Sequence, residues 1–120
     1  MRPFPEDYEL LGFFEVEPKV LDPEIPWAYN ELFFTSTAPN GVLETKMESG
    51  HEVIEFKWFQ NGNLSLHLNL VGVSKIEIGN SSTVIEPNTL VATFRNSDLE
   101  KLIVRIRPFI SFKWGYNDRR

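Results

Sequence analysis

The chain contains no cysteine, and this absence removes several kinds of chemistry at once. Without thiols there is no disulfide framework, no thiolate nucleophile and no cysteine-ligated zinc or iron–sulfur centre. Histidine is nearly as scarce, with two residues among 120. His51 and His67 fall on different predicted strands or turns without an obvious third partner, so the sequence does not indicate a catalytic triad.

Motifs that hold phosphate, metal or an activated serine are also missing. No glycine-rich phosphate loop, Gly-x-Ser-x-Gly turn or His-Glu-x-x-His helix occurs. Asp7, Asp22 and Glu24 lack the spacing of a calcium loop. Glu15 and Glu17 share one face of an extended segment, but no neighbouring apolar pocket that would raise one pKa is readable from the sequence. We therefore expect no enzymatic activity, no catalytic residues, no cofactor and no metal site.

Long hydrophobic runs are absent as well. The first seven residues contain no apolar run of signal-peptide length, and no later stretch approaches the length of a membrane span. Hydrophobic residues make up 42% of the chain and charged residues 24%, which is typical of a folded globular protein. We expect a single domain over residues 1–120, located in the cytoplasm and without membrane contact.

Prolines are concentrated at the start of the chain. Five of the eight lie in residues 1–26, which we interpret as a proline-rich acidic lead-in that is extended or irregular. A short helix from Pro5 to Leu11 is the one exception expected there. Pro5 would take the first helical position, and Gly12 would follow the end of the helix.

From Trp27 onward, short runs of alternating apolar and polar residues are separated by turn signals, which is typical of antiparallel β-structure. The hairpin around Gly62 allows a test of register, because paired residues on neighbouring strands share a face. A two-residue loop would mix apolar with polar partners. A three-residue loop, 61–63, keeps one face apolar through the pairs Trp58–Leu66, Phe56–Leu68 and Ile54–Leu70, and we predict that register.

Near the end of the chain, apolar and polar residues alternate, and this alternation continues across Pro108. Side chains from Leu102 to Trp114 keep one parity, which predicts one strand bent or bulged at Pro108 and lying at a sheet edge. Ser97 and Glu100 have the spacing of a helix capping box, so a helical turn there is an open alternative. The predicted fold is mainly β: an antiparallel sandwich or flattened, partly open barrel of about seven or eight strands with at most one or two short helical turns.

Charge is divided unevenly along the chain. The first sixty residues hold twelve acidic and four basic residues, and the last sixty hold five acidic and eight basic ones. Basic residues near the end are interleaved with aromatic ones, a pattern that can bind single-stranded nucleic acid. The net charge of −5 opposes that interpretation, and we expect no direct contact with nucleic acid. A concentrated acidic surface instead favours a basic protein partner.

Residues 15–30 combine acidic residues, prolines and two large aromatic side chains, and together with Glu31 they are called the segment 15–31. It contains Glu17-Pro18, Asp22-Pro23, Pro26-Trp27 and Tyr29-Asn30, and a β-rich remainder follows. In this pattern the chain resembles small bacterial immunity proteins of polymorphic toxin systems. The resemblance implies a non-enzymatic antidote that binds and masks a toxin domain. Trp27 and Tyr29 have a second interpretation, as residues that open the first strand on its core face.

The hypothesis from the sequence is therefore an immunity protein whose acidic surface masks a basic cognate toxin, with a nuclease as the toxin class that the charge favours. The alternative is a β-sandwich module for a small molecule or carbohydrate, with Trp58, Trp114 or Tyr116 as a stacking platform. The oligomeric state is left open. The expected partner-binding residues are Glu15, Glu17, Asp22, Glu24, Trp27, Tyr29 and Glu31.

Overall fold

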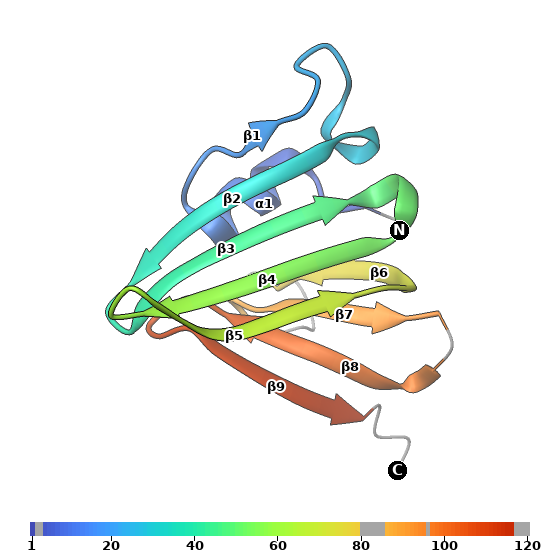
Figure 1. The fold of residues 1–120 in the computed structure, drawn as a ribbon. Helices are drawn as coiled ribbons and strands as arrows, with labels where there is room; N and C mark the ends of the chain where they lie inside the picture. Colours follow the sequence, from blue (N-terminus) through green and yellow to red (C-terminus); the bar gives the residue numbers. More distant parts are fainter. Residues whose placement is uncertain (2–3, 80–85, 96, 117–120) are drawn as a thin grey trace.

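Two antiparallel β-sheets make up most of the protein, as a computed structural model shows for residues 1, 4–79, 86–95 and 97–116 (Figure 1). The mainly β, two-sheet prediction is confirmed, and the described residues contain nine strands where about seven or eight were expected. Sheet A has the order β1-β2-β3-β4-β5, and sheet B has the order β6-β7-β8-β9. The strands are β1 (Lys19–Val20), β2 (Glu31–Ala38), β3 (Gly41–Glu48), β4 (Val53–Gln60), β5 (Asn63–Leu70), β6 (Val73–Ile78), β7 (Leu90–Phe94), β8 (Ser97–Arg105) and β9 (Ser111–Tyr116).

The hairpin between β4 and β5 has the predicted side-chain pairs but not the predicted loop. Trp58 pairs with Leu66, and the other two predicted pairs are also present. Gln60, however, pairs with Asn63, so the loop has two residues, Asn61 and Gly62, both with positive φ. The register shifts between Trp58 and Phe59, and this β-bulge restores the apolar face that a two-residue loop alone would have lost.

The predicted single strand across Pro108 is wrong, because the chain reverses there. β8 ends at Arg105, β9 begins at Ser111, and the two strands pair antiparallel with Leu102 opposite Trp114. Side-chain parity is the same on both sides of this turn, which is why the alternation alone suggested one continuous strand. The helical turn considered at Ser97 is also wrong, since β8 starts at that residue.

The first helix lies later in the chain than predicted, since its N-cap is Glu6 and Pro5 is outside it, and it covers part of the core. Helix α1 spans Asp7–Phe14, so it continues through Gly12, and it ends where Glu15 adopts a left-handed conformation. Its buried side chains are Leu10, Phe13 and Phe14, and the Phe14 ring stacks on Phe34 of β2 at a centroid distance of 3.9 Å. The hydroxyl of Ser36 on β2 also donates a 3.0 Å hydrogen bond to the carbonyl of Phe14. The C-terminal end of α1 is thereby fixed to sheet A.

A polar contact joins the two sheets just after the C-terminal end of β2. The side chain of Asn40, in the turn between β2 and β3, donates to the carbonyl of Ile110 at 2.9 Å and accepts from its N–H at 2.8 Å. The indole N–H of Trp58 donates to the Asn40 carbonyl at 3.1 Å. Two short 3-10 turns complete the described elements, η1 (Trp27–Tyr29) and η2 (Ser49–His51). None of the described helices is long and apolar enough to cross a membrane.

Gly41 provides a test of this packing, because its φ is +137° and a Cβ there would collide with the Phe59 carbonyl and lie 2.8 Å from Trp58 Nε1. We expect Gly41→Ala to lower the free energy of unfolding by about 2–4 kcal/mol. Gly62→Ala is the matched control: its φ is +77° but no atom lies within 4 Å of the added Cβ, so about 1 kcal/mol is expected. Urea denaturation of both variants measures the difference, and equal losses would contradict the packing described for Gly41.

Candidate partner-binding surface

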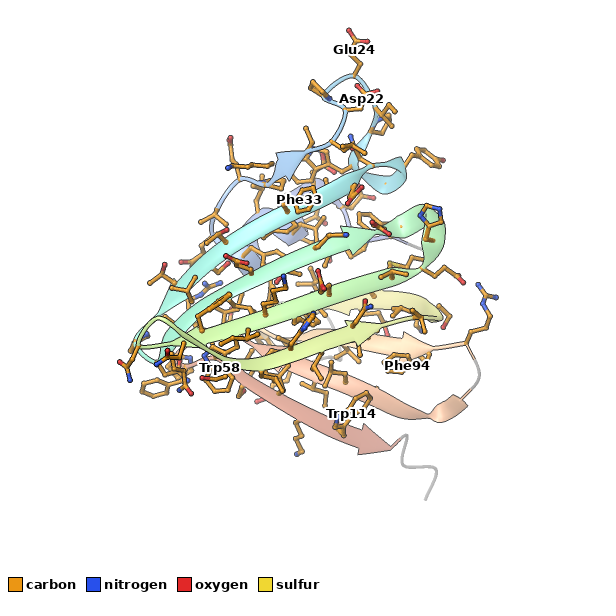
Figure 2. The ribbon with its side chains drawn as sticks, in the orientation of Figure 1. Asp22, Glu24, Phe33, Trp58, Phe94 and Trp114 are labelled. Carbon is orange, nitrogen blue, oxygen red and sulfur yellow. The ribbon has the colours of Figure 1, made fainter. Side chains whose placement is uncertain are left out.

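Residues 21–30 form a loop that projects from sheet A between β1 and β2, and Figure 2 shows Asp22 and Glu24 at its tip. One buried side chain holds the loop together. Asn30 is 6% exposed, and its Oδ1 accepts the backbone N–H groups of Asp22 at 3.1 Å and Glu31 at 2.9 Å. Its Nδ2 donates to the carbonyls of Asp22, at 2.5 Å, and Ile25, at 3.0 Å. A single amide thus replaces the strand pairing that the loop lacks.

Local hydrogen bonds fix the tip of the 21–30 loop further. The Asp22 carboxylate accepts the backbone N–H of Glu24 at 3.0 Å, and the Ile25 N–H donates to the Asp22 carbonyl at 3.2 Å. Pro23 and Pro26 restrict φ within the same few residues. A loop ordered in this way loses little conformational entropy when a partner binds, so more of its contact energy can appear as affinity.

The seven expected partner-binding residues divide into two groups by their positions in the fold. Glu15 lies 3.0 Å from Arg107, and Glu31 lies 3.5 Å from Lys46, so both carboxylates are already paired. Trp27 is partly buried and packs against the core, as its second interpretation expected, but it lies in η1 and not at the start of a strand. Of the other four, Glu17, Glu24 and Tyr29 are exposed, and Asp22 is half-buried.

Negative charge in the segment 15–31 is therefore only partly neutralised by the basic end of the chain. Arg107 contacts Glu15 and also donates to the carbonyls of Gly12 and Phe13 at the end of α1. Glu17, Asp22 and Glu24 make no ion pair with any residue that the structure describes. Glu17 and Glu24 are also exposed, whereas the Asp22 carboxylate is half-buried and accepts the Glu24 N–H.

Apolar side chains accompany these carboxylates. Leu21 is 69% exposed, Tyr29 61% and Ile25 40%. Large aromatic and aliphatic side chains surrounded by polar residues are typical of protein interfaces, where burial of apolar area supplies most of the affinity. The exposure of Leu21 and Ile25 was not anticipated from the sequence, because their alternation with polar residues is equally consistent with a strand.

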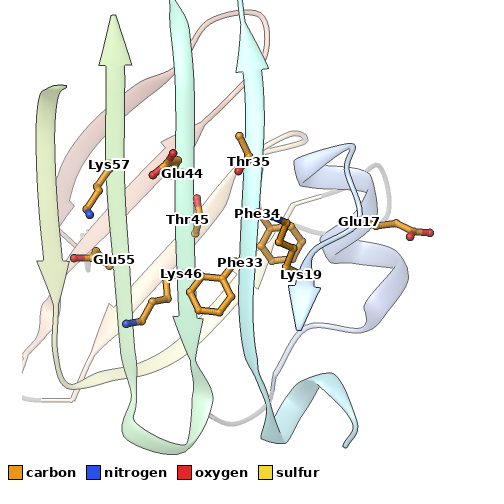
Figure 3. Close-up of a pocket in the computed structure, with 10 residues that line it drawn as sticks. All are labelled: Glu17, Lys19, Phe33, Phe34, Thr35, Glu44, Thr45, Lys46, Glu55 and Lys57. Atoms are coloured by element: carbon orange, nitrogen blue, oxygen red, sulfur yellow. The ribbon is translucent and has the colours of Figure 1, made fainter. Parts of the chain in front are cut away.

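A groove of about 460 Å³ lies beside this segment on the outer face of sheet A (Figure 3). Phe33, on β2, is 38% exposed in the groove, and charged side chains of both signs surround it. The strand register explains their arrangement, since Glu44 faces Lys57, and Lys46 lies between Phe33 and Glu55. Opposite charges alternate across neighbouring strands, so the groove is nearly neutral overall.

Each of the two histidines contacts one glutamate. His51 is exposed, with its Nδ1 3.6 Å from Glu48, and His67 Nε2 lies 2.7 Å from Glu55 on the outer face of sheet A. The hydrogen bond with His67 is the largest influence that lowers the pKa of Glu55, and the nearby charge of Lys57 acts in the same direction. No three His, Asp or Glu side chains among the described residues are placed to share a metal ion.

The basic residues considered for nucleic-acid binding and the aromatic residues considered for ligand stacking partly make contacts within the fold. Arg105 lies 2.5 Å from Glu86, and Arg107 is held at the end of α1, while Arg119 and Arg120 lie outside the described residues. Trp58 packs on Phe112 with a centroid distance of 6.1 Å, so its ring is not a free stacking platform. Trp114 is 54% exposed, and the side chain of Tyr116 is outside the described part.

Comparison with known proteins adds one structural likeness. A chain of the contact-dependent growth inhibition toxin–immunity protein complex from Klebsiella pneumoniae 342 is similar to this protein, with a TM-score of 0.74 and 25% sequence identity. The alignment covers 93% of this chain and 94% of that chain. No protein-family profile and no curated protein sequence matches. The resemblance to immunity proteins of toxin systems is thus supported over nearly the whole chain rather than only the segment 15–31.

Asn30→Ala tests whether this amide holds the loop. Removing its side chain leaves part-buried backbone groups without these partners, so we expect the free energy of unfolding to fall by about 1–3 kcal/mol. Hydrogen exchange at the Asp22 and Glu31 amides should also become faster. Asn69→Ala, an exposed change on β5, should alter stability by less than about 0.5 kcal/mol. Unchanged exchange at Asp22 and Glu31 would show that other contacts order the loop.

The contact between His67 and Glu55 predicts a pH dependence. Because the folded-state pKa of Glu55 is lowered from 4.5, the contact stabilises the protein above that value and the stabilisation is lost as the pH falls through the folded-state pKa. We expect the Glu55 pKa, followed by carboxyl carbon NMR, to rise toward 4.5 in the His67→Gln variant. The Glu52 pKa, which is lowered mainly by Arg95, should not move and serves as the internal control.

Proposed function

We propose that this protein is an immunity protein, which binds a toxin domain and blocks it without performing any reaction. The observation that carries the proposal is the likeness to a chain of a toxin–immunity protein complex over 93% of the sequence. That complex contains two kinds of chain, so the properties of the present protein have to decide which of the two it corresponds to.

The side chains of this protein are more consistent with the immunity component of such a complex than with the toxin component. A toxin that acts as an enzyme needs acid–base, nucleophilic or metal-binding groups brought together at one place. In the described residues, the two histidines each contact a different glutamate, and no metal-binding cluster occurs. The most organised polar feature is the 21–30 loop, whose hydrogen bonds present side chains outward rather than into a pocket.

The proposed contact surface is the outer side of the segment 15–31. Glu17, Asp22 and Glu24 would attract a basic partner, and Leu21, Ile25 and Tyr29 would supply apolar contact area. Glu15, Trp27 and Glu31 would support this surface from behind through Arg107, the core and Lys46. The carboxylates would therefore speed the encounter with the toxin, and the apolar side chains of the same segment would hold the complex together.

The charge of this surface favours a nuclease as the toxin. Enzymes that act on nucleic acid need basic substrate clefts, and an acidic loop can occupy such a cleft in place of the phosphate backbone. Since a nuclease of this kind damages nucleic acid inside the cell, the immunity protein would act in the cytoplasm. It would bind the toxin directly and would not contact nucleic acid itself.

Co-expression tests the function. The toxin domain encoded by the neighbouring reading frame should arrest growth when it is expressed alone, and co-expression of this chain should restore growth. The two proteins should also purify as a complex. Growth arrest caused by this chain by itself would identify it as the toxin component, and failure to restore growth or to form a complex would reject the proposal.

Charge reversal tests the contact surface separately from the function. Glu17→Lys with Glu24→Lys removes two unpaired carboxylates without removing any described hydrogen bond, so the fold should persist. We expect association with the toxin to slow by about 10- to 100-fold at low salt, and the difference to shrink as salt screens the charges.

The control is Asp7→Lys with Glu77→Lys, which changes the net charge equally at exposed or half-exposed positions on α1 and β6 and also removes the ion pair between Lys75 and Glu77. Surface plasmon resonance at several salt concentrations compares the two double variants. Equal slowing in both would mean that overall charge, rather than the segment 15–31, determines association.

A further inference from the structure

Strand β5 forms one edge of sheet A, at the opposite side of that sheet from β1 and the 21–30 loop (Figure 1). Its eight residues, Asn63–Leu70, contain no charged side chain and no proline, and leucine alternates with asparagine, serine and histidine. The outer edge of such a strand has backbone N–H and C=O groups without strand partners, and these can pair with another strand.

The other edge strands in the described residues carry features that discourage such pairing. β1 has only two residues, Lys19 and Val20, and follows Pro18. β6 carries Lys75 and Glu77, which form a 3.4 Å ion pair, and its register shifts near Val73. β9 includes Lys113. Short length, charge and irregular register are the usual means by which proteins keep sheet edges apart, and β5 has only the bulge at its hairpin end.

Apolar side chains around β5 are left uncovered. Leu64 is 51% exposed, and Val71, directly after the strand, is 67% exposed. Trp114 on β9 shares its side-chain parity with Phe112, which packs on Phe56 of β4 at 5.5 Å. Trp114 is nevertheless 54% exposed and contacts Phe94 at 5.6 Å (Figure 2). The ring of Trp114 is therefore only partly covered, although its parity is that of the core-facing residues of β9.

We propose that β5 is a self-association site, at which a second copy of this chain adds its own β5 in antiparallel orientation. The alternation of the strand is self-complementary. A two-fold axis at Leu68 sets Leu66 of one copy opposite Leu70 of the other, and His67 opposite Asn69, so leucines remain on the inner face and polar side chains on the outer face. The regular pairing of Leu66 to Leu70 with β4 keeps this part of the strand straight enough to accept it.

Charge favours a second copy over another kind of partner at this edge. A chain with a net charge of −5 repels its own copies, so they must meet where charge is absent, and β5 is the edge that meets this condition. A basic partner would gain no attraction there. The added strand would extend sheet A over Trp114 in both copies, while the 21–30 loops at the other edge would stay free. The two edges of sheet A would thus have separate roles.

Analytical ultracentrifugation of the isolated protein, from about 5 to about 200 µM, tests the proposal. The interface is small, so we expect a monomer of 13.9 kDa at the lowest concentrations and a dimer at the highest. Asn69→Lys places a charge on the exposed face of the edge and should increase the dissociation constant at least tenfold. Trp114→Ser should weaken the dimer as well, because less apolar area is buried.

Thr37→Lys on β2 is the matched control, since it makes the same change of charge at an exposed position of the same sheet. It should leave the dimer unchanged, and circular dichroism should show that all variants fold. A protein that stays monomeric over the whole range would overturn the proposal. A dimer that Asn69→Lys leaves intact would also overturn it, because another surface would then be responsible. Neither result bears on toxin binding by the segment 15–31.

Discussion

The packing of α1 against β2 positions the chain that connects these two elements. The Phe14 ring stacks on Phe34, the Ser36 hydroxyl binds the Phe14 carbonyl, and Arg107 holds the last turn of the helix from the side of sheet B. Since the end of α1 is fixed to both sheets, the chain that leaves it has a defined starting point. The segment 15–31 begins there, so the placement of its carboxylates depends on apolar contacts within the core.

Alternation of side chains predicted much of the fold, and its failures have a common cause. The pairs that join Trp58, Phe56 and Ile54 to β5 could be predicted because apolar residues must share a face. The loop length could not, because a bulge changes parity by one residue and leaves no separate mark in the sequence. At Pro108 the alternation is unchanged, because the turn between β8 and β9 keeps side-chain parity. The alternation therefore gave no sign that the chain reverses there.

The candidate surface could be predicted in location but not in detail. The composition of residues 15–31 indicated an acidic segment with prolines and aromatics, and the structure places Glu17, Asp22 and Glu24 outside any ion pair within the described residues. Which carboxylates are neutralised depends on contacts between distant parts of the chain, such as Glu15 with Arg107 across more than ninety residues. Asn30 was missed for a similar reason, because a buried asparagine and a surface one look alike in a sequence.

In the 21–30 loop, the hydrogen bonds that set the backbone conformation do not depend on the identity of the exposed side chains. Asn30 binds backbone groups of Asp22, Ile25 and Glu31, and backbone groups are present whatever the side chains are. The side chains of Leu21, Glu24 and Ile25 can therefore be exchanged with little effect on how the loop is built. Recognition of a new partner could evolve at these positions while the scaffold that displays them stays the same.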